Sequence, residues 1–96
     1  MRIRWTRPAS LDLQHLQDHI AQDNPRAAFR IASLIRERTD RLADHPFSGR
    51  IGRVHGTREL VVADTPYVVA YRVKEDKGSV DILAVIHGAR KWPEQF

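Results

Sequence analysis

The chain has 96 residues, no cysteine, and 16 Lys and Arg against 12 Asp and Glu, which gives a formal net charge of +4. This length predicts one domain, residues 1–96, with a small hydrophobic core, and the lack of cysteine excludes disulfides and thiolate metal sites as supports for it. No apolar run is long enough to span a bilayer and the first residues lack a secretory signal, so we expect a cytoplasmic protein without membrane association.

The N-terminal half predicts a short strand followed by a helical hairpin. Ile3–Trp5 forms the strand, and Pro8 suits the first turn of the next helix, where a backbone donor would have no partner. The first helix carries one apolar stripe, formed by Ala9, Leu13, Leu16 and Ile20. Asn24 is a favourable helix cap and Pro25 a favourable first residue, so a second helix starts there and ends before Pro46.

The C-terminal half predicts a basic loop followed by a sheet. Residues 46–56 contain three glycines and a proline, which break regular structure, together with two arginines and a histidine. Three strands are expected over Arg58–Val62, Tyr67–Lys74 and Val80–His87, and they form an antiparallel meander. Alternation in the last strand places Val80, Ile82, Ala84 and Ile86 on the core face and His87 on the open face. The order β-α-α-β-β-β predicts an α+β domain with its helices packed on one face of the sheet.

Basic residues gather around the expected strands. A ribonuclease that works without a metal needs a base, an acid and fixed cations for the phosphorane charge. Arg58, His87 and Arg90 could supply these groups from the first and last strands of the meander. The alternative interpretation is that Arg58 pairs with a carboxylate such as Glu59 or Asp81, and that His87 merely ends a strand.

Three other patterns invite a functional interpretation. His15 and His19 have the spacing of metal ligands on a helix, but no third ligand is evident, so we expect a solvated helix face and neither metal nor cofactor. Glu37 and Arg41 are spaced for a surface ion pair. Trp92 could stack on a base, anchor a partner or seal the edge of the core, and core packing is the favoured role.

Four segments in this order and spacing resemble the RelE/ParE toxin superfamily. They are Leu42–Arg53 (Leu-x-x-x-Pro-x-x-Gly-Arg-x-Gly-Arg), Gly56–Val62, Pro66–Val73 and Ile82–Pro93. The helical hairpin is similar as well, through Asp12-Leu13 and the run Asp23-Asn24-Pro25-Arg26-Ala27-Ala28. The resemblance covers nearly the whole chain, and it implies the toxin of a type II system that a co-encoded antitoxin holds inactive.

The resemblance implies one of two mechanisms, because RelE-like members cut messenger RNA in the ribosomal A site and ParE-like members block DNA gyrase. By position, Arg58, His87 and Arg90 match the basic catalytic residues of the ribonuclease branch. However, Trp92 and Pro93 stand where that branch has a tyrosine, and the ending is more similar to the ParE side. Gyrase inhibition without catalysis is therefore favoured. The alternatives are a ribosome-dependent endoribonuclease and a non-toxic member that keeps only the fold and antitoxin binding.

The net charge of +4 predicts a small acidic antitoxin as partner in every case. Such a protein would lay an amphipathic helix in a groove or add a strand to a sheet edge. The target is gyrase, or alternatively the ribosome with its messenger RNA. Contacts to target or antitoxin are assigned to Arg50, Arg53, His55, Arg72, Lys91 and Trp92.

Overall fold

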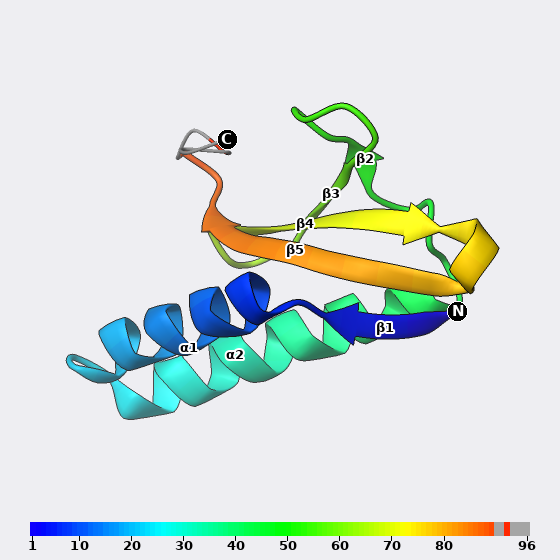
Figure 1. Cartoon of the computed structure of the whole chain (residues 1–96). Coiled ribbons are helices and arrows are strands. Elements are labelled where there is room, and N and C mark those ends of the chain that lie inside the picture. Colours follow the sequence, from blue (N-terminus) through cyan, green and yellow to red (C-terminus); the bar gives the residue numbers. More distant parts are fainter. Residues whose placement is uncertain (90–91, 93–96) are drawn as a thin grey trace.

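The computed structural model describes residues 1–89 and Trp92 (Figure 1). Its helices are α1 (Arg7–Ala21) and α2 (Pro25–Asp40), with 3₁₀ turns η1 (Arg41–Ala43) and η2 (Glu75–Lys77). Its strands are β1 (Arg2–Trp5), β2 (Arg50–Ile51), β3 (Arg58–Val61), β4 (Tyr67–Lys74) and β5 (Ser79–His87). The predicted α+β class is confirmed. The segment expected to be an irregular loop nevertheless contains β2, because Arg50 and Ile51 pair with the start of β3.

Within the described residues, the sheet has five strands in the order β1-β5-β4-β3-β2. The strands β3, β4 and β5 form the predicted antiparallel meander, while β1 pairs with β5 in parallel. A parallel pair requires a crossover connection, and the α1–α2 hairpin belongs to it. Figure 1 shows both helices on one side of the sheet, with the loop after β2 and the short orange segment that follows β5 rising on the other side. We call the helix side the inner face and the opposite side the outer face.

Both helices begin directly after a capping residue, and the cap of α2 is the one that the sequence predicts. Asn24 Oδ1 accepts a hydrogen bond from the Ala27 amide at 3.0 Å, and Pro25 follows as the first residue of α2. Thr6 caps α1 through a longer hydrogen bond of 3.4 Å from the Ala9 amide. Neither helix is long and apolar enough to cross a membrane, and these are the α-helices of the described chain.

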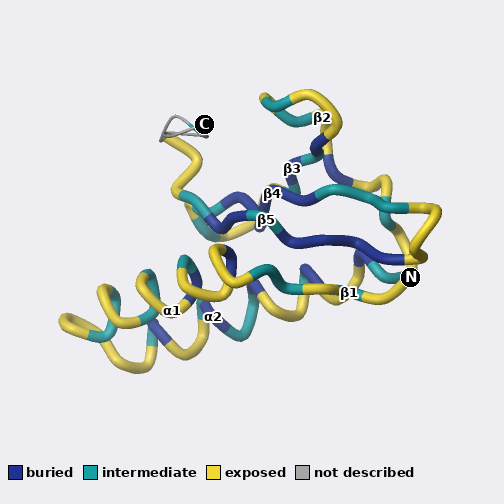
Figure 2. Tube along the Cα trace, in the orientation of Figure 1, coloured by how far each residue is buried: buried dark blue, intermediate teal, exposed yellow. Residues whose placement is uncertain are grey.

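The core lies between the helical hairpin and the inner face. Figure 2 shows buried stretches along β4 and β5 and exposed outer sides on both helices. The buried core residues are Ala9, Leu13, Ala32, Ile35, Leu42, Val62, Val69, Tyr71, Val80, Ile82 and Val85. Tyr67 and Val73 pack against this cluster, so Tyr67, Val69, Tyr71 and Val73 form the inner face of β4.

A β-bulge reverses the alternation in β5. Ala70 pairs with Ala84, but the next residue, Tyr71, pairs with Ile82, so Leu83 has no partner in the register. Beyond the bulge Val85 belongs to the core, and the prediction of Ala84 and Ile86 on the core face was wrong.

The same reversal moves His87. It pairs with Tyr67, and the two rings meet edge to face with centroids 5.9 Å apart. Directly paired residues point to the same side of a sheet. His87 therefore lies on the inner face at the exposed end of β5, not on the open face as expected.

The helix α1 closes part of the sheet edge. The strand β1 ends at Trp5, which leaves the second half of β5 without a neighbouring strand on that side. There the Val85 amide donates to Asp12 Oδ2 at 3.0 Å. A side chain from α1 thus takes the place of a strand partner.

Candidate functional site

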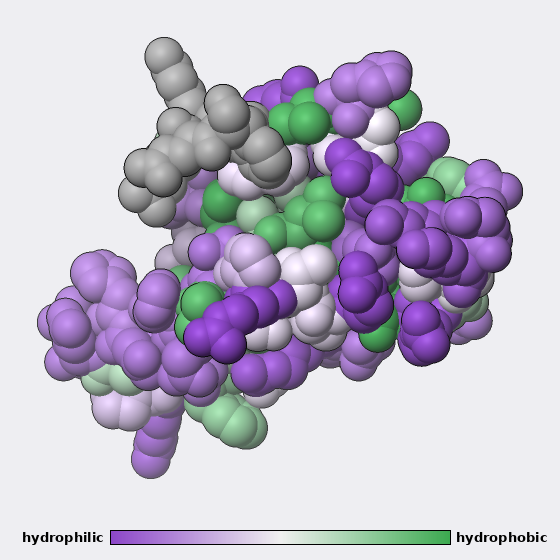
Figure 3. Space-filling model, in the orientation of Figure 1, coloured by the Kyte–Doolittle hydropathy of each residue, from purple (hydrophilic) through white to green (hydrophobic). Residues whose placement is uncertain are grey.

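The outer face carries charged residues in register. Asp81 lies opposite Arg4 on β1 and opposite Arg72 on β4, so these side chains share one row. The neighbouring rows are Arg2, Ser79 and Lys74 on one side, and Ala84, Ala70, Glu59 and Arg50 on the other. Figure 3 shows hydrophilic side chains over much of the molecule and a hydrophobic patch in its middle.

A buried carboxylate, Glu59, organises the basic loop. Its side chain is 1% exposed, yet it accepts three hydrogen bonds. Arg50 Nη2 donates to Oε1 at 3.0 Å, while the amide and Nε of Arg53 donate to Oε2 at 2.9 and 3.0 Å. Burial raises the pKa of Glu59, but the hydrogen bonds from both arginines outweigh it, so the net shift of this pKa is downward. Glu59 is thus ionised, and it fixes two arginines at once.

The loop after β2 is built tightly. The Gly52 amide donates to Thr57 O at 2.8 Å, and the Thr57 hydroxyl donates to Val54 O at 2.7 Å. A Cβ at Gly52 would overlap Thr57 Oγ1, so this close approach requires glycine. The loop holds its arginines on a defined backbone.

A second buried carboxylate, Asp81, anchors cations at the other end of the outer face. Arg4 donates to both of its oxygens at 3.0 and 2.9 Å, and Lys74 Nζ lies 3.5 Å from Oδ2. Ser79 Oγ lies 3.1 Å from Oδ1. The hydrogen bond from Arg4 is the largest cause that lowers the pKa of Asp81, and burial opposes it only in part. Asp81 therefore joins β1, β4 and β5 through charge.

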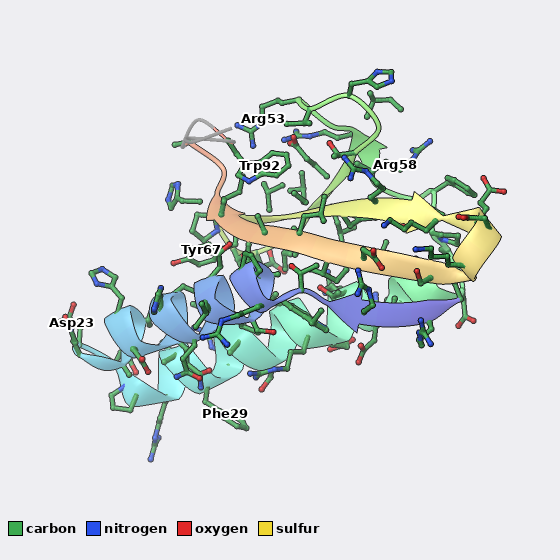
Figure 4. All side chains as sticks on the ribbon, viewed as in Figure 1. Asp23, Phe29, Arg53, Arg58, Tyr67 and Trp92 are labelled. Atoms are coloured by element: carbon green, nitrogen blue, oxygen red, sulfur yellow. The ribbon has the colours of Figure 1, made fainter. Side chains whose placement is uncertain are left out.

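Most of the residues that the sequence assigns to target or antitoxin binding lie on the outer face or in the loop above it. Arg72 Nε contacts Gly56 O at 3.4 Å, and His55 is exposed in the loop. Trp92 is half-buried, and Figure 4 shows it with Arg53 on the side of the sheet opposite the helices. Lys91 lies outside the described residues.

Arg58 is held by backbone groups on the inner side of β3. Its Nη1 donates to Phe47 O at 3.2 Å and to Gly49 O at 2.8 Å, and its guanidinium lies 5.1 Å from the centre of the Phe47 ring. The alternative of a pair with Glu59 or Asp81 was wrong, because these carboxylates take other cations.

The ribonuclease set is spread along the sheet. Arg58 pairs with Tyr71 and His87 with Tyr67, four positions along β4, which corresponds to about 13 Å. The His87 ring accepts a hydrogen bond at Nδ1 from the Ala89 amide at 3.2 Å, so its other nitrogen carries the proton in the neutral ring. Arg90, the third candidate, lies outside the described residues.

The structure tests two residue spacings that the sequence analysis noted on the helices. Arg41 and Glu37 form the predicted ion pair at 2.7 Å, and both side chains are exposed. His15 and His19 belong to no group of three or more possible metal ligands within the described part of the chain.

Sequence reasoning assigned no role to the two anchoring carboxylates. Glu59 and Asp81 were considered only as partners for Arg58. One feature of the sequence could have indicated their role. Each is the single acidic residue of its strand, β3 or β5, and the alternation of side chains places it on the outer face. Their partners could not be assigned because they come from other strands and depend on register.

The comparisons with known proteins agree over nearly the whole chain. Residues 3–92 match the family model described as the ParE toxin of the type II toxin–antitoxin system parDE. Y4kP of Sinorhizobium fredii, which is named as a candidate toxin, is 45% identical over 93 residues, covering 97% of this chain and 94% of its own. Toxin RelE2 of Caulobacter vibrioides is 39% identical over 89 residues, covering 93% and 97%.

Solved structures give the same result. The chromosomal ParDE system from P. aeruginosa contains a chain with a TM-score of 0.81 and 29% identity, covering 91% of this chain and 95% of that one. The toxin–antitoxin complex RelBE2 from Mycobacterium tuberculosis gives a TM-score of 0.66 and 27% identity, covering 90% and 95%.

A helical hairpin on one face of a small sheet is thus a fold shared with type II toxin–antitoxin systems of the RelE/ParE superfamily. Within this superfamily, the chain belongs to the ParE toxin family.

Proposed function

We propose that this toxin arrests growth by binding DNA gyrase, and that a cognate acidic antitoxin neutralises it. The observation that carries the proposal is the position of Arg58, which is bound to two backbone carbonyls and separated from His87 by four positions along the sheet. A metal-free ribonuclease needs its base, acid and cation around one phosphate. The described residues do not bring Arg58 and His87 together, which favours a toxin that acts by binding. Because gyrase acts in the cytoplasm, the proposal includes a cytoplasmic location.

A supercoiling assay with purified gyrase and toxin tests this proposal. We expect inhibition that depends on toxin concentration, and recovery when the cognate antitoxin is added. A toxin with His87→Ala should inhibit equally, because the proposed action requires no general acid or base. Unchanged supercoiling at saturating toxin would rule out gyrase as the target.

Ribosome-dependent cleavage of messenger RNA is the second candidate. It is favoured by the half-buried Trp92 near the basic loop, since an aromatic ring beside arginines can stack on a base. Primer extension after induction tests it, and new transcript ends within codons would support it. Normal growth after strong induction without antitoxin would exclude both mechanisms and favour a non-toxic family member.

The antitoxin has a suitable docking site between α2 and the edge of β3. A groove of about 290 Å³ is lined by Arg38, Arg41, His45, Ser48, Leu60 and Val61. The strand β2 pairs only with Arg58 and Glu59, so the end of β3 has no strand neighbour there among the described residues. An acidic antitoxin segment could pair with this edge and place carboxylates beside Arg38 and Arg41. Copurification with the cognate antitoxin, and its loss in an R38E/R41E variant, would test this assignment.

A further inference from the structure

The excess charge of the chain lies on the outer face. Six basic residues occupy it or the loop above it: Arg2, Arg4, Arg50, Arg53, Arg72 and Lys74. Two carboxylates, Glu59 and Asp81, accompany them. The excess of four positive charges equals the net charge of the entire sequence. Among the described residues, the outer face and its loop thus carry a marked excess of basic side chains.

These cations are held in place and still reach solvent. Glu59 and Asp81 are 1% and 3% exposed, whereas the side chains of Arg4, Arg50 and Arg53 are 55%, 58% and 38% exposed. Each buried carboxylate holds two basic side chains. Because the long side chains are already fixed, a ligand loses less entropy in ordering them.

The cations span the whole sheet. Arg4 lies on β1 at one edge and Arg50 on β2 at the other, with Arg72 on β4 between them. Four strand spacings separate the two edges, which corresponds to about 19 Å along the sheet. This width exceeds the minor groove of B-form DNA and also its major groove of about 12 Å. Such a surface can contact phosphates of both strands of a duplex.

The composition of these rows disfavours other polyanions. None of the row residues is aromatic, and Trp92 lies by the loop and outside the rows, whereas proteins that hold single strands stack successive bases on several aromatic rings. A protein partner would require an apolar centre for its interface. Among the described residues, none of the exposed large apolar side chains lies in the two rows that contain Asp81 and Glu59. The exposed Val61 lies in the next row of the outer face, with Val68 and Ile86, so the apolar part of this face stands beside the cations and not at their centre.

We propose that the outer face binds the phosphate backbone of double-stranded DNA, without sequence preference. The biological setting rests on the proposed function, because gyrase holds a DNA duplex that a bound toxin could contact at the same time. Binding to the duplex itself requires only the outer face, so it can be measured without gyrase.

Fluorescence anisotropy with a labelled 20-base-pair duplex of arbitrary sequence tests the proposal with the full chain. Because each contacted phosphate releases counterions, the logarithm of the binding constant should fall with the logarithm of salt concentration, with a slope of about −0.9 per contact. Four contacts predict a slope of about −3.6. The variant R72Q should weaken binding about fivefold and reduce the steepness of this slope by about one contact.

A matched control lies on the helices. Arg30 is exposed on α2, so R30Q removes the same charge from the other side of the molecule. It should leave both affinity and salt slope unchanged, and melting curves should show that both variants fold. Equal effects of R30Q and R72Q would overturn the proposal.

Two competition measurements complete the test. Tighter binding to a single strand of the same length, or equally effective displacement by polyglutamate of matched charge, would overturn a duplex site and indicate RNA or an acidic protein instead. Duplex binding as predicted, combined with unaffected supercoiling, would contradict only the gyrase target.

Discussion

Arg53 donates to Glu59 Oε2 twice, through its backbone amide at 2.9 Å and its guanidinium Nε at 3.0 Å. One oxygen therefore fixes both the path of the loop and the direction of the side chain. Arg50 completes the set at the other carboxylate oxygen. The basic loop depends on this one carboxylate from β3.

Replacing Glu59 with Gln should loosen the loop without destroying the fold. An amide offers one acceptor oxygen in place of two and brings donors next to two arginines. We expect a loss of about 2 kcal/mol in the free energy of unfolding, from a buried charged hydrogen-bond set that is only partly retained. Denaturant unfolding would measure the loss, and the Arg53 amide should exchange its hydrogen faster. Unchanged protection of that amide would contradict the role given to Glu59.

The lowered pKa of Asp81 predicts that the stability of the folded protein depends on pH. Its pKa is lowered in the folded state, so the unfolded chain binds a proton more readily. The resulting stabilisation is complete above the unfolded pKa of about 4 and is lost as pH falls through the lower folded value. Asp81→Asn should therefore be less stable at pH 7, by about 2 kcal/mol, and its stability should change less between pH 5 and pH 2. Parallel pH profiles for the two proteins would contradict this.

The hydroxyl group of Tyr71 accepts a hydrogen bond from the buried Gly49 amide at 2.9 Å. Tyr71→Phe keeps the ring in the core but leaves that amide without its acceptor. We expect a destabilisation of about 1–2 kcal/mol, the cost of a buried unsatisfied donor. Tyr67→Phe is a suitable control, since Tyr67 is only partly buried. Equal melting temperatures for the two variants would argue against the contact with Gly49.

Arg58→Lys separates a structural role from a catalytic one. Lysine keeps the charge but cannot donate to two carbonyls and stack over Phe47 in the same way. If Arg58 only supports the segment before β2, the variant should lose about 1 kcal/mol of stability and still arrest growth at a permissive temperature. Full stability combined with complete loss of toxicity would instead place Arg58 in a catalytic or target-binding role.

Local chemistry decided which parts of the fold could be predicted. Asn24 with Pro25 predicts the start of α2 because capping involves neighbouring residues only. The β-rich run Tyr67–Lys74 likewise predicts the strand β4 with its observed bounds. These signals lie within one element, and the structure confirms them.

The remaining features depend on contacts between distant segments. The bulge at Leu83 lies in the pairing of β5 with β4, and the sequence of the strand gives no sign of it, so Ile86 and His87 were assigned to the wrong faces. The ion pairs of Glu59 and Asp81 could not be predicted for a similar reason. Their arginines come from other strands, Arg50 from β2 and Arg4 from β1. Candidate residues could be chosen from the sequence, but their grouping required the register.

The hydrogen bond between Asp12 and Val85 bears on the tendency of the protein to aggregate at high concentration. An uncovered strand edge is a template for pairing with another chain, and the second half of β5 would present one. Asp12 occupies an amide of that edge and adds a negative charge, which discourages an incoming strand. We therefore expect this helical carboxylate to hinder pairing of the β5 edge with another chain.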